Sequence, residues 1–306
     1  MTIRFSTRTR VHAALLAPLA AAFKFAPALA QPALPANPLT IVIGGLDARE
    51  AGQPQNSDVL IVARIDHQAN TMRAFNIPRD LYVAIPGFGS DKITRAYDYG
   101  SAIDGSDKRD STAGIKLIEE TIRQNFGLDV SAGLVTEFGG FAAIVDAFGG
   151  VDVNNPYDVY DAQYPTADYG VKEIHFPADP QHLNGQEALE FSRTRHQDGD
   201  DGRVMRQHLV LRALLNQARD PSIVARLPGL YKTEKKYVQT TLSNAQQLAL
   251  LASAPNVSEN SVAFGSLLPY VSPGSTDAGA WIYVGDWSQI PGYAEGFLNG
   301  DIAAAS

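Results

Sequence analysis

Residues 58–78 read DVLIVARIDHQANTMRAFNIP and contain two apolar runs that are separated by the polar segment HQAN. Short apolar runs bounded by turn-forming residues are typical of buried β-strands. A third run, LTIVIGG at residues 39–45, ends in two glycines and has the same character. We therefore predict three strands near the start of a folded domain that begins close to Leu39.

A helix is expected after these strands, over residues 111–126. Apolar side chains recur there every three or four positions, which places them on one helical face. Ser111 or Thr112 can cap the first turn, and Gly127 can end the last one.

Further helices are indicated downstream. Asn184 and Glu187 have the spacing of a capping box, so a helix should begin there. Other helices are expected over residues 138–150, 202–219 and 243–254, and a strand over residues 151–154. Strands that alternate with helices predict an α/β fold in which helices cover a sheet.

The composition restricts the classes of protein to be considered. The chain has 306 residues, is 45% hydrophobic and 19% charged, and can therefore bury a sizeable core. Its net charge of −8 argues against general nucleic-acid binding, which needs a basic surface. The absence of cysteine excludes disulfides, thiolate metal sites and cysteine catalysis.

The first residues have the layout of an export signal. Three arginines precede a short alanine-rich apolar stretch, and Ala28 and Ala30 have the spacing of a cleavage site. We interpret residues 1–30 as a cleaved signal peptide, with a retained membrane anchor or a cytoplasmic amphipathic helix as alternatives. The proline-rich residues 31–38 are expected to be a linker, and residues 39–306 the functional domain.

Charged residues stand at the ends of the predicted strands. Asp47 follows the first strand, Asp58 opens the second, and Arg79 follows the third. Ligands of α/β proteins gather at strand ends, so these side chains can converge if the strands are neighbours. Carboxylates hold hard cations such as Mg²⁺, and arginine pairs with phosphate through its planar fork. Taken singly, each aspartate is better explained by turn formation.

A second charged cluster lies in FSRTRHQDGDDGRVMRQ at residues 191–207. Arg193 and Arg195 share a face if the segment is extended, and Arg203 and Arg206 lie about one helical turn apart, with Gln207 adjacent. The alternative is a solvated loop in which these arginines pair with Asp198, Asp200 and Asp201.

Other catalytic motifs are weak or missing. The chain contains no G-x-S-x-G nucleophile elbow, and GFGSDK lacks the third glycine of a dinucleotide motif. The histidines do not have zinc-ligand spacing. His196 lies beside the arginine pair and is interpreted as a polar loop residue, with assistance to the site as the alternative.

Several segments occur in an order that resembles the LytR–CpsA–Psr family. Their order carries the resemblance, since each segment alone is short. They are Arg49, SD (57–58), IPRD (77–80), IPG (85–87), DKI (91–93), FGGFAAIVDAFGGVDV (138–153), HLNGQEALEFSRTRH (182–196) and DGRVMRQ (201–207).

The resemblance implies a fold and an activity. The expected fold is a mixed central sheet flanked by helices on both sides, an α-β-α sandwich with an apolar cavity for a lipid. The expected enzyme is an extracytoplasmic phosphotransferase, secreted or anchored to the outer face of the cell membrane. It would move a glycopolymer, such as a teichoic acid or a capsule, from a polyprenyl-pyrophosphate carrier to peptidoglycan through a phosphodiester. No nucleic-acid partner is expected.

The resemblance also assigns roles to residues. Asp47 and Asp58 would bind Mg²⁺ or Mn²⁺, and Arg79, Asp80 and Asp47 would be catalytic. Asp80 or a metal-binding carboxylate would take the acceptor proton. The residues that would hold the pyrophosphate are Arg79, Lys92, Arg193, Arg195, Arg206 and Gln207. Those that would line the lipid cavity are Phe138, Phe141, Ile144, Val145 and Phe148. At least half of these apolar residues are expected to be ordinary core instead.

Two positions depart from the family pattern. Asn56 stands where the family usually has arginine, and Thr94 where it usually has asparagine. Arg49 or Arg95 is a candidate to replace the missing cation. Two rival functions remain open at this point: a non-catalytic binder of polyprenyl phosphates, and a metal-dependent hydrolase of lipid pyrophosphates.

Overall fold

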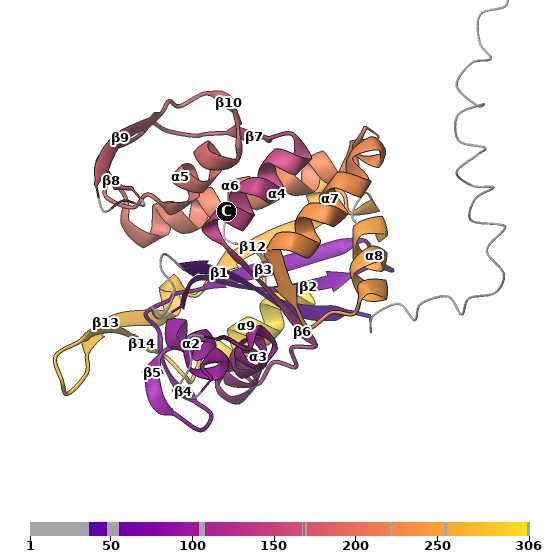
Figure 1. Ribbon diagram of the computed structural model, residues 1–306. Helices are drawn as coiled ribbons and strands as arrows, with labels where there is room; N and C mark the ends of the chain where they lie inside the picture. The colour runs from indigo at the N-terminus through magenta and orange to yellow at the C-terminus, as the bar shows by residue number, and fades with distance from the viewer. Residues whose placement is uncertain are drawn as a thin grey trace, which may run out of the picture. The chain divides into compact units, whose positions relative to one another are not determined.

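A computed structural model describes residues 37–47, 55–103, 108–166, 168, 170–220, 222–253 and 256–304 (Figure 1). The signal peptide predicted over residues 1–30, most of the linker and Arg49 lie outside the described residues. The described residues belong to one compact unit. Within them, no helix is both long and apolar enough to cross a membrane.

A six-stranded sheet forms the centre of the fold, in the order β11-β6-β1-β2-β3-β12. β1, β2 and β3 are consecutive antiparallel strands, as the three apolar runs predict, while β6 and β12 run parallel to β1 and β3. The sheet is therefore mixed. Its strands are β1 (Leu39–Asp47), β2 (Asn56–Asp66), β3 (Thr71–Ile77), β6 (Ala132–Glu137), β11 (Val238–Thr240) and β12 (Val262–Ser266).

Both faces of the sheet are covered, which gives the three layers visible in Figure 1. Along β2, Leu60 and Val62 join the core on one face, and Ile61 and Ala63 join the core on the other. This two-sided burial explains why the strands appear in the sequence as continuous apolar runs.

Helices and small hairpins make up the outer layers. One face carries α2 (Ala96–Ser101), α3 (Ser111–Phe126) and α9 (Ile290–Asn299), and the other carries α4 (Phe138–Phe148), α5 (Gly185–Arg193), α6 (Gly199–Arg219), α7 (Ile223–Tyr237) and α8 (Asn244–Ser253). The two-stranded sheets are β4 (Tyr82–Ile85) with β5 (Gly89–Lys92), β7 (Val151–Asn154) with β10 (Pro180–Leu183), β8 (Val159–Pro165) with β9 (Val171–Phe176), and β13 (Val271–Ser275) with β14 (Trp281–Gly285). The 3₁₀ turns are η1 (Ile93–Arg95), η3 (Glu259–Ser261) and η4 (Leu268–Tyr270).

The helix ends follow the capping rules, with one correction. The capping box of Asn184 and Glu187 is present at the start of α5, and Gly127 ends α3 with φ of 70°. The cap of α3 is neither Ser111 nor Thr112. Asp110 takes this place, because its carboxylate accepts a hydrogen bond from the backbone N–H of Ala113.

Candidate active site

An irregularity in the sheet brings two carboxylates to one place. Asp47 is the last residue of β1 and pairs with Asn56. The register of β1 and β2 shifts because Gly45 pairs with Val59 while Leu46 pairs with Ser57. Asp58 is therefore the extra residue of a β-bulge, a feature that redirects side chains and is common beside active sites.

Asp47 and Asp58 line a cavity of about 190 Å³ at this edge of the sheet. Four arginines and three aspartates face it, so its wall is strongly polar: Arg79, Arg193, Arg195 and Arg203 with Asp47, Asp58 and Asp161. The remaining lining residues are Val59, Phe138, Tyr164, Pro165, Ser192, Thr194, His196 and Gln207. The strand-end residues and the downstream cluster therefore meet, as expected.

Arg79 lies in a chain of alternating charges. Its Nη1 donates to Oδ2 of Asp58 at 2.9 Å, and its Nε donates to Oδ2 of Asp80 at 3.3 Å. Nζ of Lys92 donates to the other oxygen of Asp80 at 2.7 Å. Burial lowers the pKa of Arg79, but the charges of Asp58 and Asp80 outweigh it and raise that pKa. Arg79 is thus a fixed cation, and Asp80 and Lys92 support it from outside the cavity lining.

Aromatic rings orient the guanidinium of Arg193. It lies 3.9 Å from the ring centroid of Phe138, and Nη1 donates to the hydroxyl oxygen of Tyr164 at 3.0 Å. A planar cation held in this way loses little freedom when it binds an anion. Arg195 is exposed, and its guanidinium makes no hydrogen bond or ion pair within the described part of the chain.

α6 presents Arg203 and Gln207 to the cavity, but not Arg206. Arg206 is fully buried, and its guanidinium donates to the backbone oxygens of Phe191 and Thr194 and to the carboxylate of Asp198. Because Arg206 is buried among these partners and does not line the cavity, it does not reach the pyrophosphate that it was expected to hold. It fixes the turn between α5 and α6 instead.

Arg203 is the cation that the sequence analysis left without a role. It forms an ion pair with Asp200 at 3.0 Å, while its buried Nε has no hydrogen-bond partner. Burial lowers the pKa of Arg203, and repulsion from Arg79 and Arg195 adds to that effect. An anion bound in the cavity would offset both the cost of burying the charged guanidinium and its repulsion by Arg79 and Arg195. The spacing of four residues to Gln207 is the signal that identifies Arg203, since such residues share a helical face.

A histidine and a carboxylate are also paired in the cavity wall. Oδ2 of Asp161 accepts a hydrogen bond from Oγ1 of Thr194 at 2.6 Å, and Nδ1 of His196 lies 2.8 Å from Oδ1. Asp161 belongs to β8 and was not singled out in the sequence, because no local pattern links it to the motif 35 residues later.

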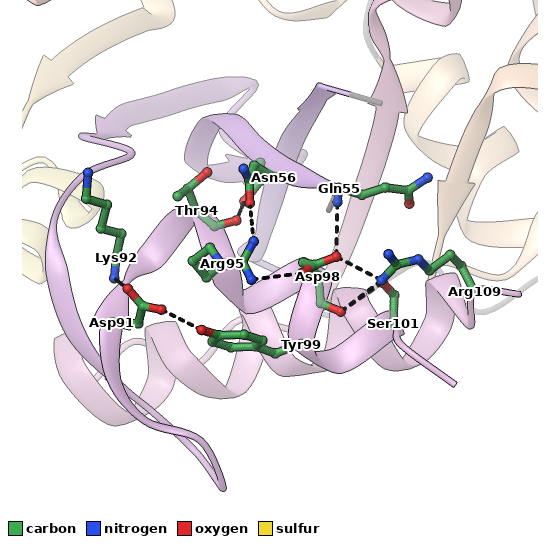
Figure 2. A network of polar contacts seen from close by, with 11 residues as sticks. Gln55, Asn56, Asp91, Lys92, Thr94, Arg95, Asp98, Tyr99, Ser101 and Arg109 are labelled. Atoms are coloured by element: carbon green, nitrogen blue, oxygen red, sulfur yellow. Dashed lines mark hydrogen bonds and ion pairs between the residues drawn. The ribbon is translucent and has the colours of Figure 1, made fainter. Parts of the chain in front are cut away.

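The two departures from the family pattern lie in a neighbouring network (Figure 2). Nη1 of Arg95 donates to Oδ1 of Asn56 at 3.1 Å, and Nη2 forms an ion pair with Asp98 at 3.2 Å. The charge of Arg95 is therefore balanced by Asp98, and Arg95 does not line the cavity. Asn56 pairs with Asp47 across β1 and β2. The network around Arg95 therefore contacts the strand pair that carries the cavity residue Asp47. Oγ1 of Thr94 is buried without a hydrogen-bond partner.

Asp98 is the centre of this network. Its carboxylate accepts from the backbone N–H of Gln55 at 3.0 Å and pairs with Arg109 at 2.8 Å, in addition to Arg95 (Figure 2). The hydroxyl of Tyr99 donates to Asp91 at 2.5 Å, and the ring of Tyr99 stacks on Phe88.

The donor set is compatible with a magnesium ion. Mg²⁺ is usually held by one or two carboxylates together with substrate phosphates and water. Asp47 and Asp58 provide two carboxylates, and the described residues contain no cluster of three or more His, Cys, Asp or Glu side chains that would form a complete protein site. The pair therefore fits an ion that is completed by a bound phosphate.

The apolar residues expected to hold a lipid are divided between two environments. Phe138 lines the polar cavity, whereas Val145 is fully buried in the core and Phe141 packs against that core. Ile144 and Phe148 are half-buried on α4. No separate apolar cavity is evident around these described residues, and the lipid cavity stays a prediction.

Comparison with known proteins gives a consistent result. The family model of the LytR_cpsA_psr family matches residues 17–293. The polyisoprenyl-teichoic acid–peptidoglycan teichoic acid transferase TagU of Bacillus cereus is 32% identical over 227 residues, which are 73% of this chain and 67% of that protein. The TagU protein of Oceanobacillus iheyensis is 32% identical over 248 residues, 80% of this chain and 71% of that protein.

Solved structures share the fold. The crystal structure of Bacillus subtilis TagV has a TM-score of 0.67 at 24% identity and covers 86% of this chain and 98% of TagV. A structure of TagT bound to LIIa-WTA has a TM-score of 0.66 at 24% identity and covers 86% of this chain and 90% of TagT. The α-β-α sandwich with a mixed sheet is thereby confirmed.

Proposed function

This chain belongs to the LytR_cpsA_psr family, and we propose that it transfers a glycopolymer from a polyprenyl-pyrophosphate carrier to peptidoglycan. The new linkage would be a phosphodiester, and polyprenyl phosphate would leave. The names of the TagU relatives, which cover more than two thirds of this chain, support a polyisoprenyl-linked teichoic acid as one class of donor. A capsule polymer on the same type of carrier is a second class of donor to test.

One observation carries the proposal: four arginines converge on a single cavity that also contains Asp47 and Asp58. A pyrophosphate diester carries two negative charges, and arginine pairs with phosphate oxygens bidentately. Two of the arginines are already oriented, Arg79 by Asp58 and Arg193 by Phe138 and Tyr164. Preorganised cations lower the barrier because they need not rearrange as charge develops on the leaving phosphate.

The residues of the chain have separable tasks in this reaction. Arg193, Arg195 and Arg203 would bind the pyrophosphate from one side of the cavity, and Arg79 from the strand end. Gln207, held by Asn76, offers an amide to a phosphate oxygen. Asp47 and Asp58 would hold Mg²⁺ or Mn²⁺, which when bound would neutralise phosphate charge.

We expect the reaction to take place outside the cytoplasm, at the membrane surface where the lipid carrier is located. The acidic chain would meet the membrane through its lipid substrate rather than through a basic surface. The half-buried apolar side of α4, with Ile144 and Phe148, is a candidate for contact with the polyprenyl chain.

The test uses the full chain with a polyprenyl-pyrophosphate glycopolymer, Mg²⁺ and a peptidoglycan fragment. Mass spectrometry follows polyprenyl phosphate and the linked acceptor together. We expect both products from the wild type, and their loss in Arg79→Ala. Arg123→Ala is the matched control, because Arg123 lies on α3 outside the cavity, where it contacts Asp129 at 3.6 Å and the backbone oxygen of Val130 at 3.3 Å.

The rival functions give different product patterns. Lipid phosphate without a linked acceptor would identify a hydrolase. Binding of the lipid without any turnover would identify a carrier protein. Either pattern in the wild type would contradict the transferase.

A further inference from the structure

A histidine and a buried carboxylate form a unit of their own inside the cavity. Nδ1 of His196 lies 2.8 Å from Oδ1 and 2.9 Å from Oδ2 of Asp161. The Asp161 side chain is 1% exposed, whereas the His196 side chain is 56% exposed. Within the described part of the chain, Nε2 of His196 has no hydrogen-bond partner, so one ring nitrogen is anchored and the other is available.

The surroundings of Asp161 determine the tautomer of the ring. Burial raises the pKa of this carboxyl, but hydrogen bonds from Thr194, the backbone of Gln163 and His196 outweigh it and lower that pKa. An ionised carboxylate can only accept hydrogen bonds, so Nδ1 carries the proton. Nε2 is then the ring nitrogen that is left to accept a proton at the cavity.

Several groups in or beside the cavity are poor proton acceptors, and Asp47 and Asp58 are the carboxylates proposed above to hold the metal ion. Arginines stay protonated in proteins, which excludes Arg79, Arg193 and the other cavity arginines as proton acceptors. Both oxygens of Asp80 are bound to cations, Oδ1 to Lys92 and Oδ2 to Arg79. One oxygen of Asp58 is also bound to Arg79. His196 is the only histidine among the residues that line this cavity.

We propose that His196 accepts the proton of the acceptor hydroxyl, and that Asp161 is its positioning residue. This inference rests on the proposed function. The acceptor oxygen forms a bond to phosphorus of the donor as the bond from that phosphorus to the bridging oxygen breaks. Polyprenyl phosphate leaves with the electron pair, and the acceptor proton passes to Nε2. Ionised Asp161 stabilises the imidazolium that results.

The first experiment replaces His196 by alanine in the full chain and measures transfer under the conditions described above. We expect kcat to fall by about 10²–10⁴-fold, the usual contribution of a general base. Affinity for the lipid donor should stay unchanged, because the arginines bind it. A fall in donor affinity with unchanged kcat would make His196 a binding residue and overturn the proposal.

His182 provides a closely matched control. Its Nδ1 lies 2.7 Å from Asp152, and its side chain is 57% exposed. It differs in that Asp152 is itself 73% exposed and neither residue lines the cavity. His182→Ala should therefore transfer at the wild-type rate. Equal losses in His182→Ala and His196→Ala would show a general effect of removing a histidine, contrary to the proposal.

Chemical rescue separates a proton acceptor from a structural residue. The exposed position of His196 leaves room for free imidazole in His196→Ala. Added imidazole should restore transfer, and substituted imidazoles should restore it in proportion to their basicity. Absence of rescue, or rescue that is independent of basicity, would contradict base catalysis.

Asp161→Asn tests the positioning role through the ring itself. Two-bond ¹H–¹⁵N spectra of the imidazole should show the Nδ1–H tautomer in the wild type and the Nε2–H tautomer in the variant. An Nε2–H tautomer in the wild type would overturn the assignment whatever the activity. The two proposals also fail separately: a wild type without transfer contradicts the proposed function, whereas full activity of His196→Ala contradicts only the role of His196.

Discussion

Nδ2 of Asn76 donates a hydrogen bond to Oε1 of Gln207 at 2.6 Å, although the two residues are 131 positions apart. Oδ1 of Asn76 in turn accepts from Nε2 of His208 at 2.6 Å. A residue at the end of β3 therefore fixes the orientation of a cavity residue on α6. The ring of His208 stacks on Phe264 and completes this contact between sheet and helix.

This relationship predicts a loss of stability in acid. Burial, helped by the charge of Arg212, lowers the pKa of His208 from 6.5 to about 4. The unfolded chain binds this proton first, so stability should fall as pH drops from 6.5 towards 4. The expected loss from His208 is about 2 kcal/mol at pH 5 relative to pH 7. Urea unfolding at both pH values measures it.

The control for this prediction is His175→Gln, at an exposed histidine of β9. His208→Gln should reduce the pH-dependent loss, whereas His175→Gln should leave it as in the wild type. An unchanged pH dependence in His208→Gln would assign the acid sensitivity to other groups.

Arg203 and Arg206 should respond differently to alanine substitution. Arg203→Ala removes a cavity cation, and we expect transfer to fall at least tenfold while the fold is retained. Arg206→Ala leaves the carboxylate of Asp198 and two backbone oxygens without their donors. Because breaking a buried ion pair is costly, this variant should lose about 3 kcal/mol of unfolding free energy. Thermal and urea unfolding, measured beside activity, distinguish the two outcomes.

The network around Asp98 should be a major source of stability. Asp98→Ala removes the acceptor of Arg95, Arg109 and the N–H of Gln55, and the Asp98 side chain is only 10% exposed. We expect a loss of about 2–3 kcal/mol in unfolding free energy. Asp129→Ala is the control, because Asp129 is 90% exposed and its ion pair with Arg123 is long. Similar unfolding curves for both variants would contradict the central place of Asp98.

A glycine controls the packing of the two helices beside the cavity. A Cβ on Gly185, at the start of α5, would lie 2.0 Å from the backbone oxygen of Ala142 on α4. Gly185→Ala should therefore cost about 1–3 kcal/mol and reduce transfer, since α4 carries Phe138 and α5 carries Arg193. Differential scanning calorimetry and the transfer assay measure the two effects.

Gly139 on α4 is the matched control. A Cβ there would meet nothing within 4 Å, so Gly139→Ala should be neutral or stabilise the helix by about 0.5 kcal/mol. If Gly185→Ala were as stable as Gly139→Ala, α4 and α5 could move apart without a loss of unfolding free energy, contrary to this prediction.

Local patterns in the sequence were sufficient for several elements of the fold. The apolar runs predicted β1, β2 and β3, and the helical spacing over residues 111–126 matches α3. The capping box at Asn184 is present because both of its partners lie within one turn. The ordered motifs also placed Arg79, Arg193, Arg195 and Gln207 in one site, and these residues do line one cavity.

The choice between neighbouring polar residues depended on the tertiary structure. Arg206 is three positions from Arg203. Asp198 and two backbone oxygens bind Arg206, whereas Arg203 faces the cavity. Asp58 reaches the site through a bulge between β1 and β2, a feature of strand register that no local pattern reveals.

The sequence by itself determined part of the strands and helices, those whose periodicity and capping signals act over a few residues. Only the tertiary structure decided which charges are free to act, because a charge is neutralised by whatever lies beside it in space. His196 depends on Asp161 across 35 positions, and Gln207 on Asn76 across 131. Such contacts follow from how layers pack, and packing is set by the whole chain.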